Sequence, residues 1–174
     1  LHAPLPFSGL LGLEVADVAA ATNWLTKQSQ QPGTIFTSWR LQGGNTSVIP
    51  DHLRNNVYLT YPRNLPEDNM MKIKVLKHWL KIRKIPVTNL DIQSQMYFLG
   101  WMLPGAITHM RSEFFRDYFI ESFDMMKDQD YAIAAFPRLT FGPGQRYASK
   151  GCYIVQLTDG AQPELIKKSE WIIH

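Results

Sequence analysis

The sequence of 174 residues is poor in cysteine and in charge, with one cysteine, Cys152, and 19% charged residues. One thiol excludes an internal disulfide framework and a zinc site built from several thiolates. The net charge of +3 falls short of the basic stripe that is typical of nucleic-acid binding, so nucleic acid is not an expected partner. No apolar run approaches the roughly 18 residues that a membrane-spanning helix needs.

Motifs for catalysis and metal binding are also lacking. The five histidines show no metal-ligand spacing, and no paired carboxylates accompany them. Cys152 shares one face of an alternating run with Ile154 and Gln156. Such a cysteine is most often a small buried hydrophobe, with a reactive thiol as the alternative. We therefore predict no catalytic residue, no metal, no cofactor and a protein that is not an enzyme.

What the sequence does contain is material for a packed core. It is 45% hydrophobic and 12% aromatic, which predicts a single α/β domain over residues 1–174. Runs rich in β-branched and aromatic residues predict strands at 34–41, 57–61, 138–141, 152–157 and 170–173. Helices are predicted at 10–27, 69–84, 89–110 and 113–124, with Asn69, Asn89 or Asp91, and Ser112 as caps. Pro104 and Gly105 are expected to kink or interrupt the third helix.

The closing segment, residues 136–174, is the most informative part of the chain. It contains Phe-Gly-Pro-Gly-Gln-Arg at residues 141–146, which at first suggests a phosphate-binding loop. Pro143 removes one backbone donor and no lysine-serine pair follows, so a type II turn between two strands explains the glycines better. The alternating run after Gly151 then predicts a β-hairpin.

The predicted helix over residues 69–84 is basic and amphipathic. Its apolar face carries Ile73, Leu76, Trp79 and Leu80, with lysines largely elsewhere around the helix. A face of this kind usually packs on a core while the lysines are solvated. Attachment to a membrane surface or to an acidic partner is the alternative.

Aromatic residues supply the candidates for a ligand site, because aromatic side chains commonly line the clefts that hold organic ligands. Tyr58 and Tyr61 lie near the end of a predicted strand that breaks into a loop. Trp101 lies in the predicted helix over residues 89–110. We predict Tyr58, Tyr61 and Trp101 as ligand-binding residues.

The order of elements from residue 56 onward carries a family resemblance. Asn-Val-Tyr-Leu-Thr-Tyr-Pro at 56–62 is followed by helices, by the segment 136–155, by Tyr-Ile-Val-Gln-Leu-Thr-Asp-Gly at 153–160 and by Ser-Glu-Trp-Ile at 169–172. This order resembles the C-terminal part of type I periplasmic solute-binding proteins, the branched-chain amino-acid receptor type of ATP-driven uptake systems. Within that family it is most similar to the subgroup found near quinoprotein alcohol dehydrogenase systems.

The resemblance implies a periplasmic-binding-protein-like α/β lobe with a parallel sheet, helices on its faces and a C-terminal β-hairpin. Members of this family have two lobes joined by crossing strands, and the chain here is considerably shorter. The sequence also begins with Leu1 and not with methionine. We therefore expect a fragment or a reduced form of a two-lobed binding protein.

The resemblance also implies a function, the non-enzymatic binding of a small solute in an interlobe cleft for transport or sensing. The expected location is the periplasm. The expected partners are a small-molecule ligand and a membrane transporter or another protein subunit. The alternative is a structural or interaction subunit whose apolar surfaces pack on a protein partner, since an incomplete lobe leaves apolar faces to cover.

Overall fold

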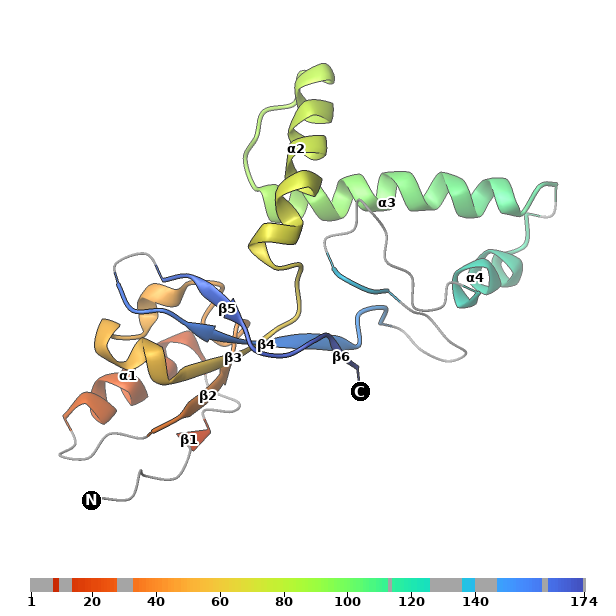
Figure 1. The fold of residues 1–174 in the computed structure, drawn as a ribbon. Helices are drawn as coiled ribbons and strands as arrows, with labels where there is room; N and C mark the ends of the chain where they lie inside the picture. Colours follow the sequence, from red (N-terminus) through yellow and green to blue (C-terminus); the bar gives the residue numbers. More distant parts are fainter. Residues whose placement is uncertain are drawn as a thin grey trace. The chain divides into compact units, whose positions relative to one another are not determined.

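The chain divides into two compact units in the computed structural model of this protein (Figure 1). Leu1–Pro62 and Cys152–Ile172 form one compact unit, which we call the sheet unit. Arg63–Gly151 and Ile173–His174 form the other, the helical unit. The structure describes residues 8–9, 14–27, 33–112, 114–125, 136–139, 147–160 and 163–173.

The sheet unit is built on a mixed sheet, so the expectation of a mixed α/β protein is confirmed. Its strands are β1 (Ser8–Gly9), β2 (Ile35–Ser38), β3 (Val57–Tyr61), β4 (Gly151–Leu157), β5 (Leu165–Lys167) and β6 (Ile172–Ile173). The first three are parallel neighbours, β4 is antiparallel to β3, and β5 is antiparallel to β4. The short strand β6 pairs with β4.

Parallel neighbours need crossover connections, because the chain must return to the starting edge before the next strand. The helix α1 (Val15–Thr26) connects β1 to β2, and two short 3₁₀ helices, η1 (Thr46–Val48) and η2 (Asp51–Asn56), connect β2 to β3. Val18 and Thr22 form the buried side of α1. The Thr22 hydroxyl donates a hydrogen bond to the Val18 carbonyl at 2.8 Å, which satisfies a polar group inside the core.

Side chains alternate between the two faces of the sheet, as they must in extended chain. The buried face of the sheet carries Ile35, Thr37, Val57, Leu59, Tyr61, Val155 and Leu157. The predicted alternation over residues 152–157 agrees with this, since Val155 and Leu157 are both fully buried. The other face is open, and Phe36 and Ile166 remain 42% and 43% exposed on it.

The predicted strand over residues 57–61 has the bounds of β3, and β2 lies within the predicted strand over residues 34–41. The closing hairpin was predicted between residues 138–141 and 152–157, around the turn at residues 141–146. The hairpin that the structure shows is a different one, between β4 and β5, where the Thr158 backbone N–H donates to the Glu164 carbonyl. The Phe-Gly-Pro-Gly-Gln-Arg sequence at residues 141–146, on which the turn prediction rested, lies outside the described residues.

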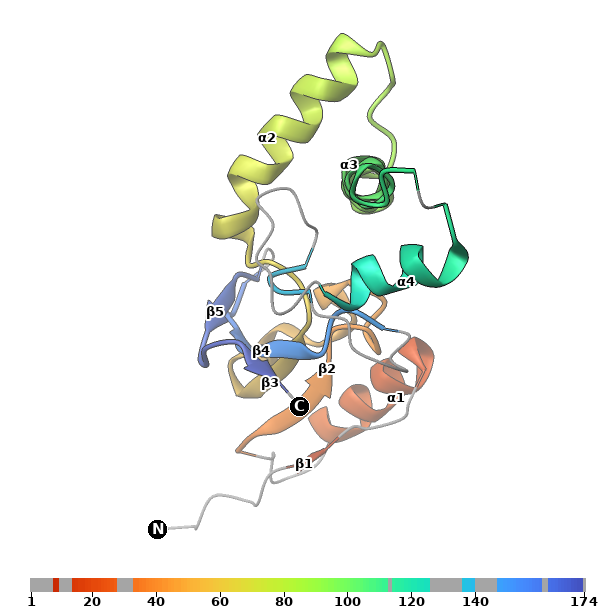
Figure 2. The same ribbon diagram turned by 90° about the vertical axis from the view of Figure 1, so that its right-hand side faces the viewer.

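The helical unit contains α2 (Pro66–Ile82), α3 (Leu90–His109) and α4 (Arg116–Asp124). Figure 2 views α3 end-on, and α3 contacts both other helices. The buried side chains of these helices include Leu76 and Leu80 on α2 and Phe98, Met102 and Ala106 on α3. Of the two predicted caps, Asn89 or Asp91, the N-cap is Asn89, because its side chain accepts hydrogen bonds from the N–H groups of Asp91 and Ile92. Among the described helices, none is long and apolar enough to cross a membrane.

Two predicted helix caps are wrong. Helix α2 begins at Pro66 and not after Asn69, because proline suits the first helical position and Glu67 and Asp68 favour the first turn. Ser112 does not cap α4, whose N-cap is Phe115.

Pro104 does not interrupt α3. A proline in a helix removes one backbone hydrogen bond, and here it lies on the exposed surface. The Thr108 hydroxyl donates to the Pro104 carbonyl one turn later.

Candidate functional site

The predicted ligand-binding tyrosines lie on opposite faces of β3. Tyr61 is 7% exposed, and its ring meets Trp39 edge-on with ring centroids 5.1 Å apart. Tyr58 lies on the open face beside Phe36, at a centroid distance of 5.6 Å. Side chains alternate along a strand, so residues three apart lie on opposite sides of the sheet. The two tyrosines therefore do not converge on one ligand.

Trp101, the third predicted ligand-binding residue, belongs to the helical unit. It lies on α3 and its side chain is 55% exposed. The structure therefore does not bring Trp101 and the two tyrosines together within one unit.

A pocket of about 590 Å³ lies at the carboxyl edge of the parallel strands in the sheet unit. We call it the carboxyl-edge pocket, and it is lined by Glu14, Val15, Ala16, Ser38, Arg40 and Leu41. The volume falls in the range of about 300–1,000 Å³ that is common for ligand pockets. Open α/β sheets bind ligands outside the carboxyl ends of their strands, which is where this pocket lies.

Two segments distant in sequence meet at the carboxyl-edge pocket because β1 and β2 are parallel. Glu14 follows β1 and directly precedes α1, while Ser38 ends β2 and is followed by Arg40. Parallel strands bring their carboxyl ends to one edge of the sheet. Pairing of β1 with β2 therefore places a carboxylate and a guanidinium around the same opening.

Glu14 is held at the start of α1 by reciprocal hydrogen bonds with Asp17. The Glu14 side chain accepts from the Asp17 backbone, and the Glu14 N–H donates to Asp17 Oδ2 at 3.2 Å. This is a capping box with acidic residues at both positions, and it fixes where the Glu14 carboxylate sits. A carboxylate accepts several hydrogen bonds, so Glu14 keeps capacity to contact a ligand.

The loop after β2 is shaped by two consecutive glycines. Gly43 and Gly44 have φ values of +61° and +73°, in the region that only glycine adopts routinely. A Cβ on Gly43 would come within 3.2 Å of Val15 Cγ2. Gly43 thus lets the loop that carries Arg40 approach the start of α1.

Trp39 forms the other support of this loop. Its backbone N–H donates to the Thr60 carbonyl at 3.1 Å, which extends the pairing of β2 and β3. Its ring packs against Tyr61, the last residue of β3. Tyr61 therefore lies at the predicted end of the strand, where its buried ring supports Trp39.

The helical unit contains a second pocket, of about 890 Å³, where α3 ends and α4 begins. His109, Arg111, Ser112, Phe115 and Tyr118 are among the residues that line it. A smaller cavity of about 180 Å³ is bounded by Phe98, Met102, Leu139 and their neighbours. Its walls are almost wholly apolar side chains from the packed core of this unit, so it offers few polar groups to orient a ligand.

The absence of metal and thiol chemistry was a prediction from sequence. No group of three His, Cys, Asp or Glu side chains among the described residues is placed to hold a metal ion. Cys152 is half-buried on β4, and burial raises the pKa of its thiol. A raised pKa lowers the fraction of thiolate, which is the reactive form.

Comparisons with protein-family models, with curated proteins and with solved structures return no match for this chain. Sequence reasoning did not single out Glu14 or Arg40. The signal that could have found them is positional, since each follows a strand of a parallel pair and such residues face the ligand edge of the sheet.

Proposed function

We propose that this protein binds a small zwitterionic solute at the carboxyl-edge pocket and releases it unchanged. The observation that carries the proposal is the placement of Glu14 and Arg40 around one opening at the ligand edge of a parallel sheet. The resemblance to periplasmic solute-binding proteins of the amino-acid receptor type supports the same function.

The two charges define the class of solute. A free α-amino acid carries an ammonium and a carboxylate on the same carbon atom. Arg40 offers the planar donor fork that matches a carboxylate, and Glu14 offers acceptors for an ammonium. Both side chains are exposed, so each contact contributes modestly and salt weakens it. The remaining walls, which include Val15, Ala16 and Leu41, suit an apolar side chain on the solute.

A periplasmic-binding-protein-like fold belongs to the same proposal. Two connections between the units, at residues 62–63 and 151–152, support it, because more than one connection lets two lobes hinge without separating. Release in the periplasm to a membrane transporter also belongs to the proposal and rests on the resemblance alone. Hinge closure on a small molecule is the usual mechanism for proteins of this kind.

The test compares three ligands that share the isobutyl side chain of leucine, namely leucine, isopentylamine and 4-methylpentanoate, by isothermal titration calorimetry on the whole chain. We expect leucine to bind most tightly. Arg40→Ala should weaken leucine and the acid while leaving the amine unchanged. Glu14→Gln should weaken leucine and the amine, and it keeps the side-chain oxygen that caps α1.

Lys27→Ala is the matched control, because Lys27 is an exposed basic residue at the end of α1 and does not line the pocket. Its leucine affinity should equal that of the unmodified chain. Equal affinity for leucine in the Arg40→Ala and Lys27→Ala variants would contradict the proposed site. Failure of all three ligands to bind the unmodified chain would contradict the proposed solute class.

A further inference from the structure

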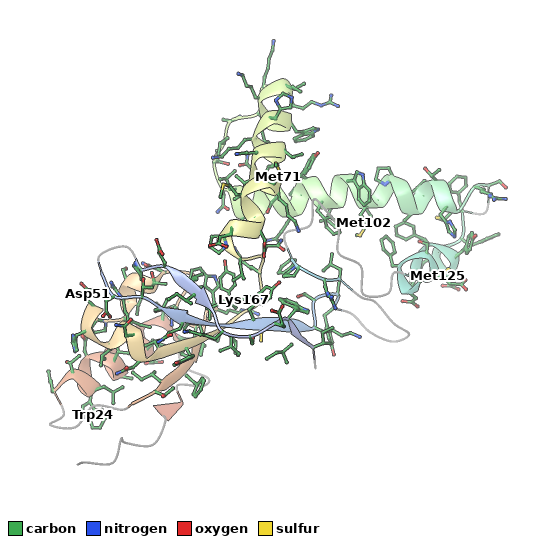
Figure 3. All side chains as sticks on the ribbon, in the orientation of Figure 1. Trp24, Asp51, Met71, Met102, Met125 and Lys167 are labelled. Carbon is green, nitrogen blue, oxygen red and sulfur yellow. The ribbon has the colours of Figure 1, made fainter. Side chains whose placement is uncertain are left out.

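Helix α2 carries a row of exposed apolar side chains on the side that faces away from its buried residues. Met71, Val75 and Ile82 recur at helical spacing and are 68%, 42% and 64% exposed. Met71 is labelled on α2 in Figure 3. The buried residues Leu76 and Leu80 lie on the other side of the same helix. Packing within the helical unit therefore leaves this apolar row exposed.

A row of lysines runs beside the apolar row. Lys74, Lys77 and Lys81 are all exposed and recur at spacings of three and four residues. At about 100° per residue, the two rows are neighbours on the outer side of α2, with His78 between them. The alkyl stem of a lysine lies readily along apolar surface while its ammonium reaches outward. We call the two rows together the outer face of α2, which consists of Met71, Lys74, Val75, Lys77, Lys81 and Ile82.

The positive charge of the chain is concentrated on α2 and the turn that follows it. Between Asp68 and Asp91 the sequence contains no Asp or Glu. The same stretch carries six basic residues, namely Lys72, Lys74, Lys77, Lys81, Arg83 and Lys84. The whole chain has a net charge of +3, so the rest of the chain is net negative.

The acidic residues around this stretch do not neutralise the lysines of the outer face. Glu67 and Asp68 belong to the first turn of α2, more than one turn before Lys74. Helix α3, which packs on α2, has one acidic residue, Asp91, and its carboxylate pairs with Arg63 at 2.5 Å. Within the described part of the chain, no acidic side chain pairs with the three lysines of the outer face. Their charge is available to an external anion.

We propose that the outer face of α2 binds an anionic phospholipid surface, with the helix lying parallel to the membrane plane. This inference goes beyond the proposed solute binding and does not depend on it. The lysines meet the lipid phosphates. The apolar row enters the boundary between the headgroups and the acyl chains, where amphipathic helices with basic residues commonly bind.

An anionic lipid surface matches both rows at once. A nucleic acid would meet the lysines and leave the apolar row in water. A protein partner would need a much larger contact, because a stable interface uses about 20–30 residues per side and the outer face has six. A lipid surface needs only a few inserted apolar side chains and several cations, since each contributes separately to binding.

The first experiment measures flotation of the whole chain with vesicles of phosphatidylglycerol and phosphatidylcholine in equal parts, and with vesicles of phosphatidylcholine alone. We expect binding to the anionic vesicles only, weakened by added salt. The double variant Lys77→Gln, Lys81→Gln should lower the partition coefficient about 25-fold, because each basic residue near an anionic surface contributes about fivefold. Glutamine is also a good helix former, so circular dichroism should show unchanged helix content.

The matched control for charge is the double variant Lys27→Gln, Lys168→Gln. Both lysines are exposed and lie in the sheet unit, and their loss changes the net charge by the same amount. At physiological ionic strength, charges further than about 8 Å from the lipid are largely screened. The control should therefore bind anionic vesicles like the unmodified chain.

The second experiment tests the apolar row with Ile82→Ser, which changes no charge. It should weaken binding to anionic vesicles by roughly fivefold, because part of the isoleucine side chain leaves water at the interface. Ile120→Ser is the control, since Ile120 lies on α4 and is 44% exposed, and it should bind like the unmodified chain.

Three results would overturn the inference. The first is an unmodified chain that does not float with anionic vesicles. The second is an equal loss of binding in the two double variants, which would show that net charge and not the outer face of α2 attracts the lipid. The third is unchanged vesicle binding in Ile82→Ser, because the lysines alone would then carry the attraction, as they would for a nucleic acid or an acidic protein.

Discussion

Replacement of Arg54 by alanine perturbs the one charged side chain that is buried among the described residues. Arg54 lies on η2 and is 4% exposed. Its Nε donates to the Ile49 carbonyl at 3.0 Å, and Nη1 donates to the carbonyl of Gly160 in the turn after β4. Nη1 also pairs with Asp51 Oδ1 at 2.6 Å. One side chain thus joins two segments that lie far apart in the sequence.

The loss in the free energy of unfolding depends on which of the Arg54 partners is buried. Hydrogen bonds from a charged donor contribute about 1.5–3 kcal/mol each, and stripping one leaves a buried acceptor without a partner. Asp51 is labelled in Figure 3. Its side chain is 66% exposed, and an ion pair with an exposed partner contributes about 0–1 kcal/mol. We expect Arg54→Ala to cost about 3 kcal/mol and Asp51→Ala to cost less than about 1 kcal/mol.

Thermal unfolding followed by circular dichroism measures the two costs. For a unit of this size, 1 kcal/mol corresponds to a shift of roughly 4–8 °C in Tm. Hydrogen exchange at the β3 and β4 amides shows whether the loss falls on the sheet unit, where Arg54 lies. Equal losses for the two variants would refute the reasoning, because the ion pair and not the carbonyl contacts would then carry the stabilisation.

Two further predictions concern the pocket loop and the single thiol. Gly43→Ala should destabilise the sheet unit by about 1–2 kcal/mol, since alanine resists the positive φ and its Cβ would press on Val15. Gly43→Ala should also weaken leucine binding in calorimetry. Gly105→Ala, in a helix where a Cβ meets no atom, is the control and should leave leucine binding unchanged. Unchanged stability and unchanged leucine affinity in Gly43→Ala would contradict this prediction. Cys152 should react with iodoacetamide at neutral pH more slowly than a cysteine peptide, because burial raises the pKa of its thiol. The contribution of the Cys152 thiol to stability is complete below the ordinary pKa of cysteine and is lost as the pH rises through the raised pKa. A difference in the free energy of unfolding between the unmodified chain and Cys152→Ala that stays constant at several alkaline pH values would argue against the raised pKa.

Local patterns predicted a good part of the fold. The run Val57–Tyr61 is β-branched and aromatic, and it forms β3 with the bounds that the sequence indicated. The Asn89 cap and the alternation of Val155 and Leu157 were also predicted, because caps and period-two burial depend on near neighbours. The predicted start of α2 at Asn69 was wrong, because Pro66 suits the first helical position and starts the helix earlier.

The sequence by itself determined a mixed α/β protein with one cysteine, without a disulfide framework, and with aromatic strands that form a core. Tertiary structure decided which residues meet. Glu14 and Arg40 converge only because β1 pairs with β2 in parallel. The local sequence of neither segment predicts that the two will pair. The opposite faces of Tyr58 and Tyr61, in contrast, follow from the alternation of side chains along β3. Periodicity acts over a few residues, whereas a site is assembled by contacts between distant ones.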